Sequence, residues 1–136
     1  MSDLKLEFLT LCDFAMTSSE GKLSVIGMFD RMFVTETPAK FLRFFIVAIV
    51  SGKPEKEAKI LFNVQTPSKK KALNPKEVVV KIGSGGRTNI ITDVGNFPLP
   101  ETGEYKLSVT SDGKVLGSIS FFASKVTAQS NKKTVN

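Results

Sequence analysis

Residues 100–122 read PETGEYKLSVTSDGKVLGSISFF, and this stretch indicates the fold class. Apolar residues occupy alternate positions of its first half, which is the two-residue period of a strand with one buried face: Tyr105, Leu107 and Val109. Asp112-Gly113 follows, a dipeptide that tolerates positive φ at both centres of a two-residue turn. The alternation resumes at Val115, Ile119 and Phe121. The stretch therefore predicts a β-hairpin with one face in a core.

The rest of the chain contains further strand-like segments separated by turn residues. They are Leu4–Cys12, Leu23–Val34, Phe41–Val50, Ala58–Val64, Val78–Ile82 and Ile90–Leu99. Phe41–Val50 is apolar on both faces except at Arg43, which predicts a central strand covered on both sides. No window has sustained helical periodicity, so we expect at most one helical turn, near Phe14–Ser18. The pattern predicts an all-β antiparallel sandwich of seven or eight strands with little helix.

The type of sandwich is indicated by the single tyrosine. Tyr105 follows Glu101-Thr-Gly-Glu with the spacing of a tyrosine corner, in which the hydroxyl bonds back to upstream backbone. This favours an immunoglobulin-like sandwich, although the sequence lacks the disulfide and tryptophan of antibody domains. A related Greek-key sandwich or a small barrel is the alternative. Within Leu4–Cys12 the apolar residues change from even to odd positions, which predicts a β-bulge. Gly27 interrupts the alternation of the next segment and predicts a second bulge.

Length and apolar content bound the organisation of the chain. With 136 residues, 41% of them hydrophobic, we expect a single domain over residues 1–125 and a polar tail over 126–136. The start lacks the features of a signal peptide, and the longest apolar run, Phe44–Val50, is far shorter than the roughly 20 residues of a membrane helix. The one cysteine, Cys12, excludes an internal disulfide, and we expect it to be buried. These features predict a cytoplasmic protein without a membrane segment.

The excess of positive charge lies in the second half of the chain. Residues 1–68 contain eight basic and eight acidic side chains, whereas residues 69–136 contain eleven basic and five acidic ones. The candidate anion-binding residues are Lys69, Lys70, Lys71, Lys76, Lys81 and Arg87. Alternatively, these side chains form a solvated loop that prevents edge pairing. Residues 65–96 contain no aromatic residue for base stacking, so any nucleic-acid binding is expected to be weak and salt-sensitive.

The absence of histidine from the sequence is the strongest constraint on chemistry. It excludes histidine-dependent nucleophiles and the ligand sets of nearly all zinc sites. The remaining acidic candidates are Asp13, Asp30, Asp93, Glu101 and Glu104, which we interpret as surface groups because no Asp-x-Asp cluster occurs. The glycine-rich segment 83–87 lacks the Gly-Lys-Ser/Thr of a phosphate loop and is interpreted as a turn. We predict no catalytic residue, no metal, no cofactor and no enzymatic activity.

Two segments near the start carry a resemblance to a known family. Residues 8–15, FLTLCDFA, and residues 21–30, GKLSVIGMFD, resemble the opening of small bacterial and phage-associated proteins that are described only as a domain of unknown function. The Gly-x-Tyr strand and the Asp-Gly hairpin near the end are also similar, so the resemblance spans residues 4–122. It implies a compact β-sandwich and no assigned activity. The lysine-rich segment is not a feature of that family.

The sequence thus leads to three functional hypotheses. The first is a non-enzymatic interaction module that acts through protein–protein contacts or self-association, with an unknown protein or a second copy as its partner. The second is a domain that binds an anionic ligand, such as nucleic acid, polyphosphate or an acidic glycan, through segment 69–87. The third is a hydrolase that depends on carboxylates or a hard metal ion.

Overall fold

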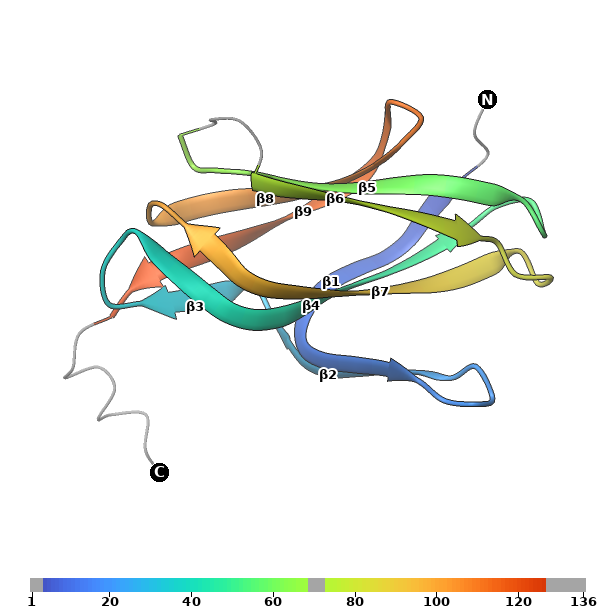
Figure 1. Ribbon diagram of the computed structural model, residues 1–136, viewed down its shortest axis with the longest axis horizontal. Coiled ribbons are helices and arrows are strands. Elements are labelled where there is room, and N and C mark those ends of the chain that lie inside the picture. Colours follow the sequence, from blue (N-terminus) through green and yellow to red (C-terminus); the bar gives the residue numbers. More distant parts are fainter. Residues whose placement is uncertain (1–3, 69–72, 127–136) are drawn as a thin grey trace.

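Two β-sheets packed face to face form the protein (Figure 1). The computed structural model describes residues 4–68 and 73–126, which contain nine strands and no helix. The strands are β1 (Lys5–Thr17), β2 (Leu23–Phe29), β3 (Arg31–Val34), β4 (Ala39–Ser51), β5 (Glu57–Gln65), β6 (Leu73–Lys81), β7 (Arg87–Leu99), β8 (Gly103–Ser111) and β9 (Lys114–Lys125). The predicted all-β sandwich is confirmed. Within these residues, no helix long and apolar enough to cross a membrane is present.

The order of the strands is that of an immunoglobulin-like sandwich. One sheet has the order β2-β1-β4-β7 and the other β3-β9-β8-β5-β6. Neighbours are antiparallel except for β3, which is parallel to β9. In immunoglobulin terms, β4 and β7 take the places of B and E, while β5, β8 and β9 take those of C, F and G. Most of the predicted tail, residues 127–136, lies outside the described residues.

Strand β4 is the centre of its sheet, as its apolar sequence predicts. It lies between β1 and β7, and all five side chains of residues 44–48 are buried. Phe44, Ile46 and Ala48 belong to the main core between the two sheets. Phe45 and Val47 belong to a second apolar cluster. Because successive side chains point to opposite faces of a sheet, this strand requires cover on both sides.

The predicted hairpin of residues 100–122 is confirmed as β8 and β9. Its turn has positive φ at both Asp112 (51°) and Gly113 (77°). Tyr105 is fully buried, its ring stacks on Phe121, and its hydroxyl donates a hydrogen bond of 2.5 Å to the carbonyl oxygen of Glu101. Burial raises the pKa of the Tyr105 phenol. The tyrosine corner expected from the sequence is therefore present.

Three expectations about the strands need correction. The helical turn near Phe14–Ser18 is wrong, because β1 continues as a strand to Thr17. Leu23–Val34 is two strands in different sheets, divided at Asp30, whose carbonyl oxygen accepts a hydrogen bond from the backbone of Phe122. Val115 is 61% exposed, because the pairing of β8 with β9 shifts after Val109. The bulge predicted in the first strand is confirmed, between Leu6 and Phe8, but the one predicted at Gly27 is wrong, because the register of β1 with β2 does not shift there.

Candidate functional site

The basic residues singled out in the sequence do not gather into one site where the structure describes them. Lys76 and Lys81 lie on β6, five residues and about 17 Å apart, in a regularly paired stretch that directs them to opposite faces. Lys76 donates a hydrogen bond to the carbonyl oxygen of Asp93 (3.2 Å), and Lys81 forms an ion pair with Glu55 (3.4 Å). Arg87 is exposed at the start of β7. Lys69, Lys70 and Lys71 lie outside the described residues, so the anion site remains a prediction.

The carboxylates singled out in the sequence lie at separate places. Asp93 on β7 forms two hydrogen bonds with Arg43 on β4, and this guanidinium lowers the pKa of the Asp93 carboxyl. Asp13 lies against Gly27, where an added Cβ would be 2.5 Å from its Oδ2 atom. Glu104 accepts a hydrogen bond from Ser120, and Glu101 accepts one from the Ser68 hydroxyl. In residues 4–68 and 73–126, no three acidic or cysteine side chains are placed to hold a metal ion.

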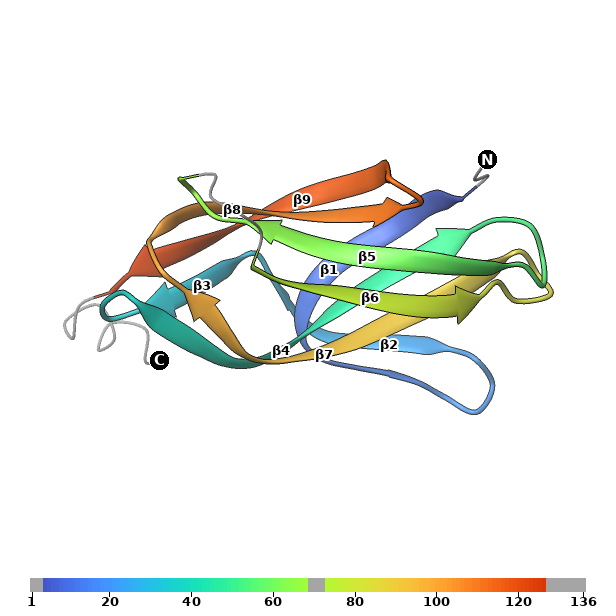
Figure 2. The same cartoon turned by 45° about the horizontal axis from the view of Figure 1, so that its top comes forward.

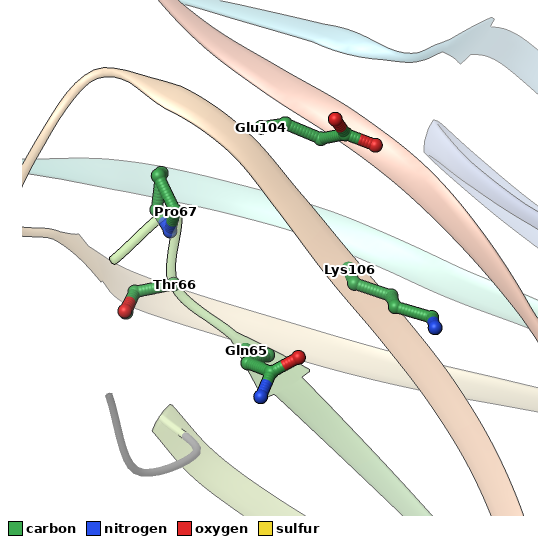
Figure 3. A pocket seen from close by; sticks show the side chains of 5 residues that line it. All are labelled: Gln65, Thr66, Pro67, Glu104 and Lys106. Carbon is green, nitrogen blue, oxygen red and sulfur yellow. The ribbon is translucent and has the colours of Figure 1, made fainter. Parts of the chain in front are cut away.

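A depression of about 380 Å³ lies on the outer face of the five-stranded sheet (Figure 3). It is lined by Gln65, Thr66, Pro67, Glu104 and Lys106, from the end of β5 and the start of β8. Its lining carries one acidic and one basic side chain. Glu104 already accepts the bond from Ser120.

The most distinctive surface lies on the hairpin formed by β1 and β2. This hairpin crosses the side of its own sheet that faces away from the other sheet (Figures 1 and 2). Four large apolar side chains on it are exposed by 45–59%: Phe14, Met16, Ile26 and Met28. We call these four residues the hairpin surface. Phe14 and Ile26 are directly opposite each other in the β1–β2 register.

The inner side of the same hairpin covers the second apolar cluster. Cys12, Ala15, Phe45 and Val47 are buried there, with Leu23 and Val25 of β2 packed against them. The prediction that Cys12 is buried is confirmed, and burial raises the pKa of its thiol. The hairpin is therefore apolar on both sides. Among the described residues its inner side is covered, whereas its outer side is covered only in part, at Phe14, whose ring meets that of Phe45 edge-on with the centroids 5.5 Å apart.

Local geometry explains how the hairpin reaches this position. At its tip, the backbone N–H of Ser18 donates to the carbonyl oxygen of Lys22 (2.8 Å), and Gly21 has a φ of 83°. At its base, Gly27 has a φ of 70° and leaves room for the side chain of Asp13. A left-handed residue in a strand increases the local twist. The twist at Gly27 lets the hairpin leave the plane of the sheet.

The outer strands of the two sheets differ in how they resist further pairing. Strand β6 carries Pro75, Lys76 and Lys81, and β7 carries Asp93 and Pro98. Strand β3 has only four residues. Charges, prolines and short strands are the usual protection of sheet edges. Strand β2, LSVIGMF, has none of these and pairs with β1 alone among the described strands.

Sequence reasoning missed this surface, although the signal was present. Within residues 14–17 and 23–29 the apolar side chains occur at both parities, without the polar alternation of β8. That pattern indicates a ribbon covered on both faces. It was interpreted as a helical turn and a bulged strand instead.

Comparisons with known proteins identify the family of this chain. A model of a family of unknown function, DUF6941, matches residues 7–124, and the chain belongs to this family. No curated protein matches the chain in sequence.

Among solved structures, the alkylpurine DNA glycosylase AlkC of Pseudomonas fluorescens, bound to DNA containing an abasic site analogue, is similar over 90% of this chain and 31% of its own, with 12% identity and a TM-score of 0.58. A β-glucosidase from Listeria innocua is similar over 93% of this chain and 17% of its own, with 12% identity and a TM-score of 0.52. An immunoglobulin-like protein of Pseudomonas aeruginosa is 21% identical over 90% of this chain and 97% of its own, with a TM-score of 0.48. The chain thus spans less than a third of the glycosylase and the glucosidase, and these two likenesses concern the fold alone.

Proposed function

We propose that this member of DUF6941 is a non-enzymatic interaction module that works through protein–protein contacts made by the hairpin surface. One observation carries the proposal: four large apolar side chains are exposed together on one hairpin, next to an edge strand without charge or proline. A cluster of exposed apolar side chains is typical of interaction sites. An unprotected edge strand is also the element that binds another strand by backbone pairing.

Chemical composition supports a binding role over a catalytic one. The sequence contains no histidine, and several of the described carboxylates bond to neighbours of their own fold, as Asp93 does to Arg43 and Glu104 to Ser120. The sole cysteine is buried against the hairpin. Because a lone buried thiol suits a reducing compartment, we place the protein in the cytoplasm.

The test compares two charge insertions at equally exposed sites. Ile26→Lys places a charge on the hairpin surface, and Val79→Lys places one on β6; the two side chains are 57% and 60% exposed. We expect protein partners co-purified from native extract to be lost with Ile26→Lys and retained with Val79→Lys. Partners retained equally by both variants would contradict the assignment to the hairpin surface. Circular dichroism and thermal melting of both variants establish that they are folded.

The alternative function is binding of an anionic ligand through segment 69–87. It is supported by the excess of basic residues in that half of the sequence. The described members Lys76 and Lys81 face opposite sides of β6, which argues for loose contact with a polymer over a compact pocket. Replacing Lys69, Lys70 and Lys71 by Glu should abolish binding to polyphosphate or single-stranded DNA at low salt. Unchanged affinity would refute this alternative.

A further inference from the structure

We infer that the hairpin surface binds the same surface of a second copy, with the two β2 strands paired antiparallel about a twofold axis. This inference rests on the proposed function and names its partner. Pairing of this kind joins two four-stranded sheets into one continuous sheet of eight strands.

The backbone of β2 presents the groups that such pairing needs. The hydrogen bond from Ser18 N–H to the Lys22 carbonyl directs Lys22 toward β1, and the register is regular from there to the pair Phe14 and Ile26. Because peptide groups alternate in direction along a strand, those of Leu23 and Val25 point away from β1. With Val25 opposite Val25 of the second copy, each donates one hydrogen bond and accepts another.

The same register brings apolar side chains together. Ser24 of each copy then lies opposite Ile26 of the other, on the exposed side of the joined sheet. Since Met16 is opposite Ser24 and Phe14 is opposite Ile26 within one copy, a row of four residues crosses the two hairpins in the order Met16, Ser24, Ile26, Phe14. Twofold symmetry produces this row twice. Cross-strand contacts of this kind stabilise sheets.

Charge favours a second copy over a strongly charged partner. Glu20 and Lys22 are the charged residues of segment 14–29, and they form an ion pair with each other (3.5 Å). The net charge of +6 is carried by residues 69–136. Asp13 is a further exposed charged residue of the hairpin, beside Gly27 at its base. The four residues of the hairpin surface are themselves uncharged, so a strongly acidic or basic partner finds little complementary charge there. A second hairpin surface, which is uncharged and apolar in the same way, matches it better than a charged surface does.

The small size of the contact sets its strength. A seven-residue edge and four partly exposed side chains from each copy form an interface at the low end of specific protein contacts. We expect dissociation constants in the micromolar range, which correspond to about −8 kcal/mol.

Sedimentation velocity over a concentration series tests the inference. The wild-type protein should pass from monomer to dimer as its concentration rises through the micromolar range. Ile26→Lys should raise the dissociation constant at least tenfold, because two ammonium groups replace apolar side chains and lie diagonally across the twofold axis, where like charges repel each other. Val79→Lys is the matched control, of equal exposure on a protected edge, and should leave the constant unchanged.

Hydrogen exchange tests the edge pairing without any substitution. The amides of Leu23 and Val25 should exchange more slowly as wild-type concentration rises, whereas those of Ser24 and Ile26, which face β1, should not change. A strict monomer up to about 1 mM would overturn the inference. So would a dimer insensitive to Ile26→Lys, or one in which Leu23 and Val25 gain no protection.

These outcomes separate the inference from the function on which it rests. If the protein is monomeric but loses a captured partner specifically with Ile26→Lys, the hairpin surface binds another protein. In that case only the assignment of a second copy as the partner is wrong. If the protein is monomeric and no partner depends on Ile26, both proposals fail.

Discussion

The hairpins β8–β9 and β1–β2 are both antiparallel ribbons with many apolar residues, but they are buried in different ways. In β8, Tyr105, Leu107 and Val109 are fully buried and the residues between them are polar. In β1–β2, the inner side covers a cluster around Phe45. On the other side Ile26 is 57% exposed, and Phe14 is 45% exposed although its ring meets that of Phe45 edge-on. The difference shows that a strict apolar–polar alternation marks a hairpin completed by its own fold. Apolar residues at both even and odd positions mark a hairpin whose second face is available to a further partner.

The largest expected loss of stability is at Tyr105, in the buried hairpin β8–β9. Tyr105→Ala should lower the free energy of unfolding by about 3–5 kcal/mol, because a large buried ring is removed. Tyr105→Phe keeps the ring and removes only the hydroxyl that bonds to Glu101, so a loss of about 1–3 kcal/mol is expected. Urea denaturation measures both values. A Tyr105→Phe variant as stable as the wild type would show that the tyrosine corner does not stabilise the fold.

A smaller effect is expected at the base of the exposed hairpin. Gly27→Ala combines a left-handed backbone with an approach of 2.5 Å to Asp13, whereas Gly21→Ala has a similar φ and no atom within 4 Å. Both should lose about 1–2 kcal/mol from backbone strain, and Gly27→Ala more than Gly21→Ala. Combining Gly27→Ala with Asp13→Ala should bring the loss close to that of Gly21→Ala. An equal loss in the two single variants would mean that Asp13 yields without cost.

The exposed face of β1–β2 should contribute little to folding. Ile26→Ala is expected to change stability by no more than about 0.5 kcal/mol when measured on the monomer at low concentration. Chemical denaturation at two protein concentrations checks this. A loss of several kcal/mol at the lower concentration would show that Ile26 is part of the core, which would remove the contrast between the two hairpins.

The smallest effect is expected at the surface pair Arg43 and Asp93, which lies outside both hairpins. Arg43 lowers the pKa of Asp93, so the pair stabilises the protein above the ordinary range of an aspartate pKa. That contribution is lost as the pH falls through the lowered value. Because both side chains are largely exposed, Asp93→Asn should cause only a slight fall in melting temperature at neutral pH and none in strong acid. A larger fall in melting temperature in acid than at neutral pH would contradict the conclusion that the ionised pair stabilises the protein.

The accuracy of the sequence predictions depended on whether the signal was local. The turn at Asp112-Gly113, the bulge near Leu6 and the central position of Phe41–Val50 follow from residues close in sequence, and all three are confirmed. Val115 was misplaced because the register shift after Val109 depends on the pairing of two strands. Residues 14–16 were misread as helical because Phe14-Ala15-Met16 fits either structure until a strand partner is known. That partner is β2, ten residues further along the chain.

Amino-acid order alone determined the class of this protein, because side-chain periodicity, turn dipeptides and the lack of histidine are properties of short segments and of composition. Only the tertiary structure decided which apolar side chains remain exposed. Exposure at Ile26 depends on the twist at Gly27, on the position of β2 at the end of its sheet and on the cluster beneath it. Each of these joins residues far apart in sequence. Burial is a property of the packed whole, and so the surface available for binding is decided only when both sheets have formed.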